Sequence, residues 1–396
     1  MTIRFAERMG RLGTESAFEV LAHARQLEAA GREIVHLEIG EPDFATPDHI
    51  VEAAVGALHG GHTHYTAAGG IPEVRTSLAG FLRRRLGVEV EPAEVVLVPG
   101  SKNVLHFMLL ACIDPGDEVI YPDPGYPVYE SLIRFVGAQP VPITLREERA
   151  FRMDMEELAG LITPRTRMLI VNSPHNPTGG VLTGGDVEVI AGLAREHDLL
   201  VLSDEIYSQM TYEEEHSSLF AVPGMRDRTV LMDGMSKAYA MCGWRLGYGV
   251  APLELAQKFE RLMINTSSCA AAFTQMAAVE AWESPESDLA VRQMVSRFKA
   301  RRDLLVAGLN RLPGVRCQVP RGAFYAFPNI EGTGMDEAAL ARGLLEEAGV
   351  AVLAGTAFGP GGRGFIRLAY TQGEEDIEKA LERMSAYLAA ERKVTA

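Results

Sequence analysis

A lysine and an arginine follow one short apolar run near the middle of the chain. Lys237 lies shortly after the run 230–232, and Arg245 lies eight positions beyond the lysine. The run predicts a buried strand, so Lys237 is expected at its carboxyl end. Partial burial favours a neutral, nucleophilic amine, and an arginine fork binds phosphate. A carbonyl cofactor with a phosphate arm, pyridoxal phosphate (PLP), requires both groups.

Other residues with useful chemistry also follow predicted strands. Short apolar runs at 95–98, 118–121, 168–171, 199–202 and 230–232 alternate with helical patterns such as 104–112 and 186–196. This alternation predicts an α/β domain with a mainly parallel sheet between helices. The residues just beyond the runs are Gly100, Ser101, Tyr126, Asn176, Asp204 and Lys237. Ligands bind at this edge of open parallel sheets, so we expect these residues to share one site.

The segment Gly100-Ser101-Lys102 joins a predicted strand to a helix, where free backbone N–H groups attract an anion. Arg245 and the Ser236 hydroxyl are candidates to complete a phosphate cradle. An ordinary capped helix start is the alternative for this segment.

Asp204 is the candidate partner of the pyridine nitrogen, because a carboxylate there keeps the ring protonated and electron-withdrawing. Capping of a following helix is its alternative role. Asn176 and Tyr207 are candidates for the ring oxygen, and Tyr126 for stacking on the ring. An ordinary loop for Asn176 and a core position for Tyr126 are the competing interpretations.

Arg367 alternates with apolar neighbours in the strand-like segment 364–370. A buried arginine needs an anionic partner, and a substrate carboxylate fits its fork. A structural ion pair is the alternative. Gly40, in Gly-Glu-Pro-Asp-Phe, is a candidate to offer a backbone N–H to the same carboxylate.

Two domains are expected from the 396 residues. The alternating pattern ends near residue 253, after which helices dominate until strand and helix signals return beyond residue 322. We predict a large cofactor-binding domain over residues 46–282. Residues 1–45 and 283–396 are expected to form a smaller α/β domain from both termini.

Composition narrows the function further. The chain is 47% hydrophobic and 23% charged with a formal net charge of −15, which disfavours nucleic-acid binding. Its four cysteines are far apart, form no Cys-x-x-Cys pair and predict reduced thiols, with no metal site. No signal-peptide pattern or membrane-length apolar stretch is present, so a cytoplasmic protein is expected.

Several motifs together resemble the fold-type-I PLP-dependent aminotransferases of class I/II, and more closely their bacterial aspartate-aminotransferase-like branch. They are Gly40-Glu-Pro-Asp, Asn176-Pro-Thr-Gly, Ser203-Asp-Glu-Ile-Tyr, Ser236-Lys-x-Tyr with Gly243-Trp-Arg-x-Gly, and the late Arg367. The resemblance covers nearly the whole chain. It implies the aminotransferase fold and ping-pong transamination between an L-amino acid and a 2-oxo acid.

The resemblance also implies a role for each matching residue. Lys237 is similar to the lysine that carries the cofactor as a Schiff base and moves the proton from Cα, with Asp204 and Tyr207 as its catalytic companions. The remaining cofactor contacts implied are Gly100, Ser101, Lys102 through its backbone, Tyr126, Asn176, Ser236 and Arg245. Arg367, Gly40 and Asn176 are implied for substrate binding. Tyr65 resembles a tyrosine that reaches the phosphate of a neighbouring subunit, which implies a homodimer with shared sites.

Three positions bear on the cofactor and the substrate. Gly234 stands where relatives often carry a hydroxyl residue, so the phosphate cup is expected to lose one contact. Lys102 resembles a lysine that reads an acidic side chain, whereas the bulky Phe18 argues against an acidic substrate. Aspartate, alanine and aromatic donors therefore stay open, with glutamate and 2-oxoglutarate as the expected coupled pair.

Competing functions remain at this stage. A carbon–sulfur β-lyase or a cyclopropane-forming synthase of the same fold would use the same cofactor residues. A PLP-sensing transcription regulator requires a DNA-binding module, for which residues before the Gly-Glu-Pro-Asp loop leave little room. A non-catalytic structural protein is disfavoured by the joint presence of Lys237, Asp204, Asn176 and Arg367.

Overall fold

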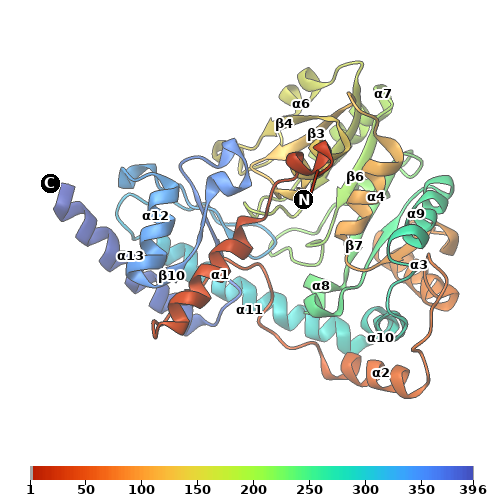
Figure 1. Ribbon diagram of the computed structural model, residues 1–396, viewed down its shortest axis with the longest axis horizontal. Coiled ribbons are helices and arrows are strands. Elements are labelled where there is room, and N and C mark those ends of the chain that lie inside the picture. The colour runs from red at the N-terminus through yellow and green to blue at the C-terminus, as the bar shows by residue number, and fades with distance from the viewer. Residues whose placement is uncertain (1–2, 396) are drawn as a thin grey trace.

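The structure is a computed structural model that describes the backbone of residues 3–395 and the side chains of residues 3–391. A seven-stranded sheet forms the centre of its larger part (Figure 1). Its strands are β2 (Val95–Val98), β3 (Glu118–Asp123), β4 (Gln139–Thr144), β5 (Thr166–Asn172), β6 (Leu200–Asp204), β7 (Thr229–Gly234) and β8 (Gly247–Val250). They lie in the order β2-β8-β7-β6-β5-β3-β4.

The sheet is mainly parallel, which confirms the predicted fold class. Only β8 runs antiparallel to its two neighbours, β2 and β7. The five apolar runs that predicted strands coincide with β2, β3, β5, β6 and β7, whereas β4 and β8 were not predicted. The carboxyl ends of the parallel strands therefore share one edge, where the candidate site residues follow.

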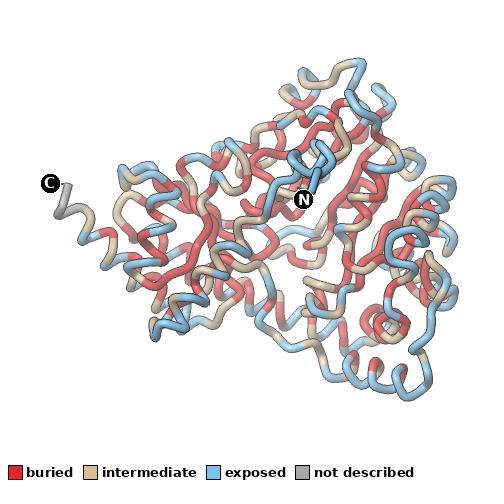
Figure 2. Tube along the Cα trace, viewed as in Figure 1, coloured by how far each residue is buried: buried red, intermediate tan, exposed pale blue. Residues whose placement is uncertain are grey.

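Alternate side chains of the strands enter cores on opposite faces of the sheet. In β5, Met168 and Ile170 pack in one apolar cluster and Leu169 and Val171 in another. Because side chains alternate between the two faces and both faces are apolar, the sheet is buried between two layers of helices (Figure 2). One face is covered by α4 (Lys102–Cys112), α5 (Val128–Val136) and α9 (Leu253–Thr266), and the other by α3 (Pro72–Leu86), α6 (Met155–Leu161), α7 (Gly184–Glu196) and α10 (Ala272–Glu283).

An N-terminal segment and the C-terminal part of the chain build the smaller part of the molecule (Figure 1), whereas Arg8 and Gly13 lie against α5 of the larger part. In the smaller part, β1 (Val35–His36) pairs in parallel with β10 (Val350–Ala351). A second small sheet has the order β11 (Leu353–Ala354), β12 (Ile366–Ala369), β9 (Tyr325–Ala326). Around them pack α1 (Ser16–Ala29), α11 (Pro285–Leu309), α12 (Glu337–Gly343) and α13 (Glu374–Thr395). The domain limits at residues 45/46 and 282/283 stay a prediction.

No helix among the described residues combines the length and the apolar character needed to cross a membrane.

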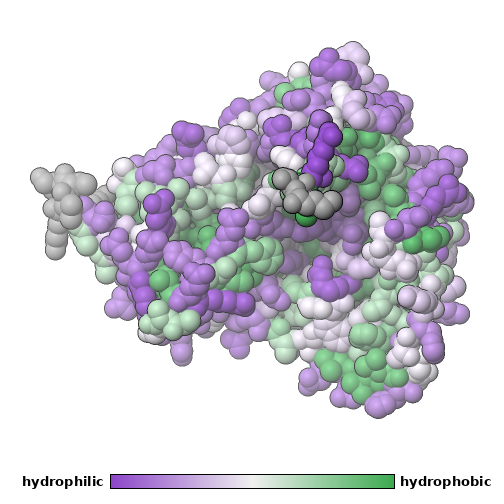
Figure 3. Space-filling model, in the orientation of Figure 1, coloured by the Kyte–Doolittle hydropathy of each residue, from purple (hydrophilic) through white to green (hydrophobic). Residues whose placement is uncertain are grey.

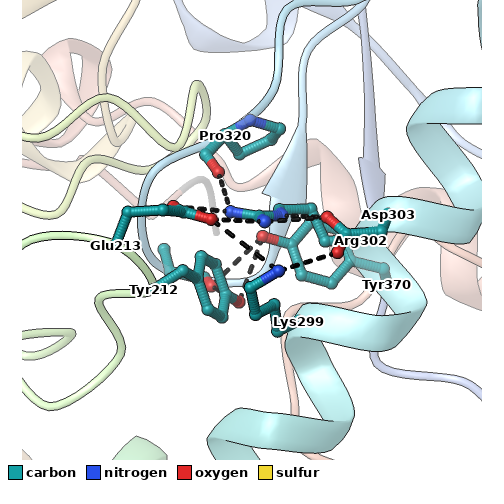
Figure 4. A network of polar contacts seen from close by, with 8 residues as sticks. Tyr212, Glu213, Lys299, Arg302, Asp303, Pro320 and Tyr370 are labelled. Atoms are coloured by element: carbon teal, nitrogen blue, oxygen red, sulfur yellow. Dashed lines mark hydrogen bonds and ion pairs between the residues drawn. The ribbon is translucent and has the colours of Figure 1, made fainter.

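A buried arginine ties the long helix α11 to the segment that follows β6 (Figure 4). The Arg302 side chain is 2% exposed and donates to both carboxylate oxygens of Glu213, at 2.9 and 2.6 Å. It also donates to the Pro320 carbonyl at 2.9 Å and lies 4.6 Å from the centre of the Tyr212 ring. The guanidinium thus joins three segments that are distant in the sequence.

We expect Arg302→Met to lower the free energy of unfolding by about 2–3 kcal/mol, because the substitution breaks this buried pair. The cost stays below that of a fully buried pair since Glu213 is nearly half exposed and regains water. Denaturant titration of both proteins measures the difference. Arg321→Met is the control, because Arg321 and Glu214 are both nearly half exposed and their pair contributes under about 1 kcal/mol. An equal effect of the two substitutions would contradict the prediction.

Asp123, the last residue of β3, links the large sheet to the loop 359–361. Its Oδ1 atom accepts a hydrogen bond from the Gly361 N–H at 3.0 Å. Burial raises the pKa of this carboxyl from 3.8 to about 6. The protonated form is therefore favoured in the folded protein, and its stabilising contribution is lost as the pH rises through about 6.

Asp123→Asn should remove this pH dependence while keeping an oxygen for the Gly361 N–H. Relative to the wild type, the variant should gain about 2–3 kcal/mol in unfolding free energy between pH 4 and pH 7. Denaturant titrations across this range give the difference. Asp227→Asn, at an exposed position, provides the control. A difference that does not change with pH would show that burial does not perturb Asp123.

Candidate active site

A cavity of about 590 Å³ opens at the carboxyl edge of the large sheet, between the two parts of the molecule. The space-filling view shows the molecule hollowed between these parts (Figure 3). The predicted site residues on the cavity wall are Phe18, Gly40, Ser101, Lys102, Tyr126, Asn176, Asp204, Tyr207, Ser236, Lys237, Arg245 and Arg367. Gly100, which precedes Ser101, and Tyr65 are the two predicted residues that do not line this cavity.

Lys237 projects into the cavity from the short helix α8 (Met235–Ala238), which follows β7. Its Nζ atom donates to the Gly40 carbonyl at 2.6 Å and lies 3.9 Å from Cys242 Sγ. The hydrogen bond connects the N-terminal segment to the end of the large sheet. The amine is thus held at the cavity without a carboxylate partner among the described residues.

Asp204 ends β6 and is 5% exposed. Its Oδ2 atom accepts a hydrogen bond from the Tyr129 hydroxyl at 2.6 Å, and Oδ1 accepts from the Ile206 N–H at 3.3 Å. Burial raises the pKa of Asp204 from 3.8 to about 6, although both hydrogen bonds oppose the shift. Residues 206–209 form turns, so the interpretation of Asp204 as a helix cap is wrong. A cation placed beside Asp204 would stabilise its charged form.

Two further predicted residues flank Asp204. The backbone N–H of Asn176 donates to Asn172 Oδ1 at 3.0 Å, which holds the turn after β5 against the sheet edge. The Tyr207 hydroxyl is 2.7 Å from the Tyr325 hydroxyl, and burial raises the pKa of Tyr207 well above its usual range. Tyr207 is therefore a neutral hydroxyl at neutral pH.

Arg245 and the first residues of α4 form another part of the cavity wall. Arg245 donates from Nη1 to the Cys242 carbonyl at 2.8 Å, while a Cβ added to Gly100 would overlap its Nη2 atom. Ser101 and Ser236 line the same cavity. At Gly234, an added Cβ would lie 2.9 Å from the Gly247 Cα atom. This close approach of two strands explains why no hydroxyl side chain occupies position 234.

Arg367 lies on β12 and is 4% exposed. Its guanidinium donates to the Glu38 carbonyl and, at 3.4 Å, to Asn176 Oδ1. Tyr325 and Phe358 lie against it, with ring centres 4.7 and 4.9 Å away. The Nε atom is buried without a hydrogen bond, and no carboxylate forms an ion pair with Arg367 among the described residues. The interpretation of Arg367 as half of a structural ion pair is therefore wrong.

Lys102 does not stand free at the cavity. It forms an ion pair with Glu15, whose Oε1 atom also accepts a hydrogen bond from the Tyr126 hydroxyl at 3.0 Å. Phe18, three positions beyond Glu15, lines the same wall and is 61% exposed. Tyr65 lies elsewhere and is 89% exposed.

Sequence reasoning missed several residues that shape the cavity: Glu15, Glu41, Tyr129, Cys242 and Tyr325. Tyr129 lies inside a helix at a position that only packing reveals. Glu15 could have been predicted, because it lies three positions before Phe18, which was expected to line the pocket.

These residues fit pyridoxal phosphate. The buried Asp204 carboxyl, with its raised pKa, would gain its charge beside a pyridinium nitrogen. The space next to Gly100 admits the Arg245 fork, which suits a phosphate. The buried Nε atom of Arg367 has no hydrogen-bond partner among the described residues, as expected of a site for an anion. Lys237 supplies a primary amine on the same cavity wall.

Comparisons with known proteins agree with this chemistry. The family model for aminotransferase class I and II matches residues 32–384. The aspartate aminotransferase of Pyrococcus abyssi is 39% identical over 370 residues, covering 93% of this chain and 95% of the relative. The arginine–pyruvate transaminase of Pseudomonas aeruginosa is 39% identical over 385 residues, covering 97% and 98%.

The solved structure of Thermus thermophilus aspartate aminotransferase with maleate superposes with a TM-score of 0.94 at 38% identity, over 98% of this chain and 100% of that one. These relatives are named for transamination, which disfavours a β-lyase. The chain therefore belongs to the class I and II aminotransferases and is a pyridoxal-phosphate-dependent transaminase, which transfers an amino group between an amino acid and a 2-oxo acid.

Proposed function

We propose that the 590 Å³ cavity is the site of transamination and that Lys237 is its central catalytic residue. The observation that carries the proposal is the convergence of four groups on one cavity wall. They are the Lys237 amine, the buried Asp204 carboxyl and the guanidinium groups of Arg245 and Arg367. They come from three separate places in the fold: the end of β6, the segment between β7 and β8, and strand β12 of the small sheet.

Pyridoxal phosphate supplies an aldehyde that takes up the amino group and a ring that withdraws electrons from Cα. Lys237 would take the Cα proton and give it back, because no carboxylate of the described residues pairs with its Nζ atom. Asp204 would hold the proton on the ring nitrogen of the cofactor, and Tyr129 orients Asp204. Tyr207 and Asn176 would supply hydrogen-bond donors for the ring oxygen, and Tyr126 would supply an aromatic face for the ring.

The remaining residues hold the ends of the cofactor and the substrate. Arg245, Ser236, Ser101 and the backbone at Gly100 and Lys102 bind the phosphate through charge-assisted hydrogen bonds. Arg367 binds the substrate α-carboxylate, assisted by Asn176 and by the backbone at Gly40.

Two-substrate kinetics test the proposed reaction. An amino acid and a 2-oxo acid that use one site in turn give parallel double-reciprocal lines, because the first product leaves before the second substrate binds. Suitable pairs are alanine with 2-oxoglutarate, and aspartate or phenylalanine with either 2-oxoglutarate or pyruvate. Intersecting lines would exclude the shared-site scheme.

We also propose a homodimer. Support comes from apolar side chains exposed on α2 (Asp48–His59), namely Val51, Val55 and Leu58, which gather at the bottom of Figure 3. The 89% exposed Tyr65 follows this helix and would reach the phosphate of the partner. Tyr65→Phe should then weaken retention of the cofactor, and sedimentation should give twice the chain mass.

We propose a cytoplasmic location, since all four cysteines are free.

A further inference from the structure

Glu15 places its carboxylate on the cavity wall beside Lys102 and Tyr126. The residue occupies the N-cap position of α1, yet its side chain makes no capping hydrogen bond with that helix. Instead Oε1 pairs with the Lys102 ammonium and accepts from the Tyr126 hydroxyl. The Glu15 side chain is 22% exposed, and among the described residues its Oε2 atom accepts no hydrogen bond. One carboxylate oxygen thus remains available to a ligand.

This carboxylate changes what Lys102 can bind. A free lysine at this position would attract an acidic side chain, as the sequence comparison implied. In the structure its charge is already matched by Glu15, and the ammonium lies 5.4 Å from the centre of the Tyr126 ring. An incoming carboxylate would have to displace Glu15 and leave that negative charge beside its own.

The charges around the cavity reinforce this effect. After Asp204, Lys237 and Arg245 are assigned to the cofactor and Arg367 to the α-carboxylate, three charged side chains remain on the wall. They are Lys102, Glu15 and Glu41, one positive and two negative, which leaves one net negative charge. This net negative charge attracts a cationic substrate side chain and repels an anionic one.

We infer that Glu15 is a specificity-determining residue that makes the enzyme prefer amino donors with a cationic side chain, a guanidinium or an ammonium, over dicarboxylic donors. The inference rests on the proposed function, because it takes Arg367 as the site of the α-carboxylate. It replaces the expectation of an acidic preference based on Lys102.

Glu15→Gln tests the inference because it removes the charge and keeps an oxygen for Lys102 and Tyr126. Two ligands that cannot react, maleate and 5-guanidinopentanoate, are titrated into the PLP-loaded enzyme. We expect the substitution to tighten maleate binding and to weaken 5-guanidinopentanoate binding, each by about tenfold. The ratio of kcat/KM for L-arginine to that for L-aspartate should exceed one in the wild type and fall at least about tenfold in the variant.

Glu19→Gln is the matched control. Glu19 lies on the same helix outside the cavity wall, and glutamine keeps an oxygen for the Thr14 hydroxyl. The control should leave both dissociation constants and the donor ratio as in the wild type. Changes equal to those in Glu15→Gln would show that only the charge of the segment matters and would overturn the inference.

Two other results would also overturn it: a wild-type preference for aspartate, and a donor ratio and ligand affinities that do not respond to Glu15→Gln. A wild-type enzyme that converts neither arginine, aspartate nor alanine would instead remove the proposed function. The affinities for the two unreactive ligands would then still decide the role of Glu15, so the two failures are distinguishable.

Discussion

Lys237→Ala is expected to lower kcat by at least about 10²–10⁴-fold, the usual contribution of a positioned general base. The Lys237 amine lies in the cavity, donates to the Gly40 carbonyl at 2.6 Å and lies 3.9 Å from Cys242 Sγ. No other lysine except Lys102 lines the cavity, and Lys102 is paired with Glu15. The loss should therefore not be compensated from within the site.

Steady-state rates with alanine and 2-oxoglutarate measure this effect. Lys258→Ala, at an exposed position of α9, controls for the loss of a lysine elsewhere on the same domain. Circular dichroism and the absorbance of retained cofactor confirm that the variant is folded and loaded. Turnover close to the wild-type rate in folded, loaded Lys237→Ala would exclude Lys237 as the proton-transferring group.

Arg367→Gln is expected to lower kcat/KM about 10²–10³-fold for every α-amino acid, because it removes the charged fork from a buried site. Most of the loss should appear in KM, since the α-carboxylate is bound both before and during the reaction. The orphaned Nε atom and the apolar rings of Tyr325 and Phe358 around the guanidinium support a role in anion binding.

The control for this substitution is Arg363→Gln, four positions earlier and exposed, which should leave kcat/KM unchanged within about twofold. Binding of maleate to Arg367→Gln gives a readout that is independent of turnover and should weaken in parallel. Normal affinity for maleate together with a normal KM would exclude Arg367 as the carboxylate site.

The sequence predicted those parts of the fold in which local pattern and tertiary structure agree. Buried parallel strands such as β2 and β7 are continuous apolar runs, so they and the residues that follow them could be placed. Parallel strands end at a common edge, and this alone predicted that Asn176, Asp204 and Lys237 meet.

Two strands of the large sheet were missed because their composition is not typical of strands. The edge strand β4 contains Pro140 and Pro142, which a sheet tolerates only where hydrogen bonds are not needed on both sides. In β8, Gly247 and Gly249 replace strand-forming side chains, since an added Cβ would overlap Ser101 or crowd Val104. Close packing on α4 therefore overrode strand propensity there.

The missed site residues come from segments that sequence patterns cannot place relative to the sheet. Tyr129 reaches Asp204 across 75 positions and Glu15 reaches Lys102 across 87. Their roles depend on how α5 and the N-terminal segment pack over the edge of the sheet. The Glu15–Lys102 ion pair shows that Lys102 is already matched by a carboxylate, which the position of the lysine in the sequence could not reveal.

Product stoichiometry tests the central claim most directly. PLP-loaded enzyme is mixed with excess L-alanine in the absence of any 2-oxo acid, and pyruvate and ammonia are quantified over time. Transamination at this cavity predicts one pyruvate per site, no ammonia, and a halt until a 2-oxo acid is added. Absence of any 2-oxo acid product from fully loaded enzyme given alanine, aspartate or arginine would contradict the account. So would continued release of pyruvate and ammonia from L-cystathionine without a 2-oxo acid acceptor.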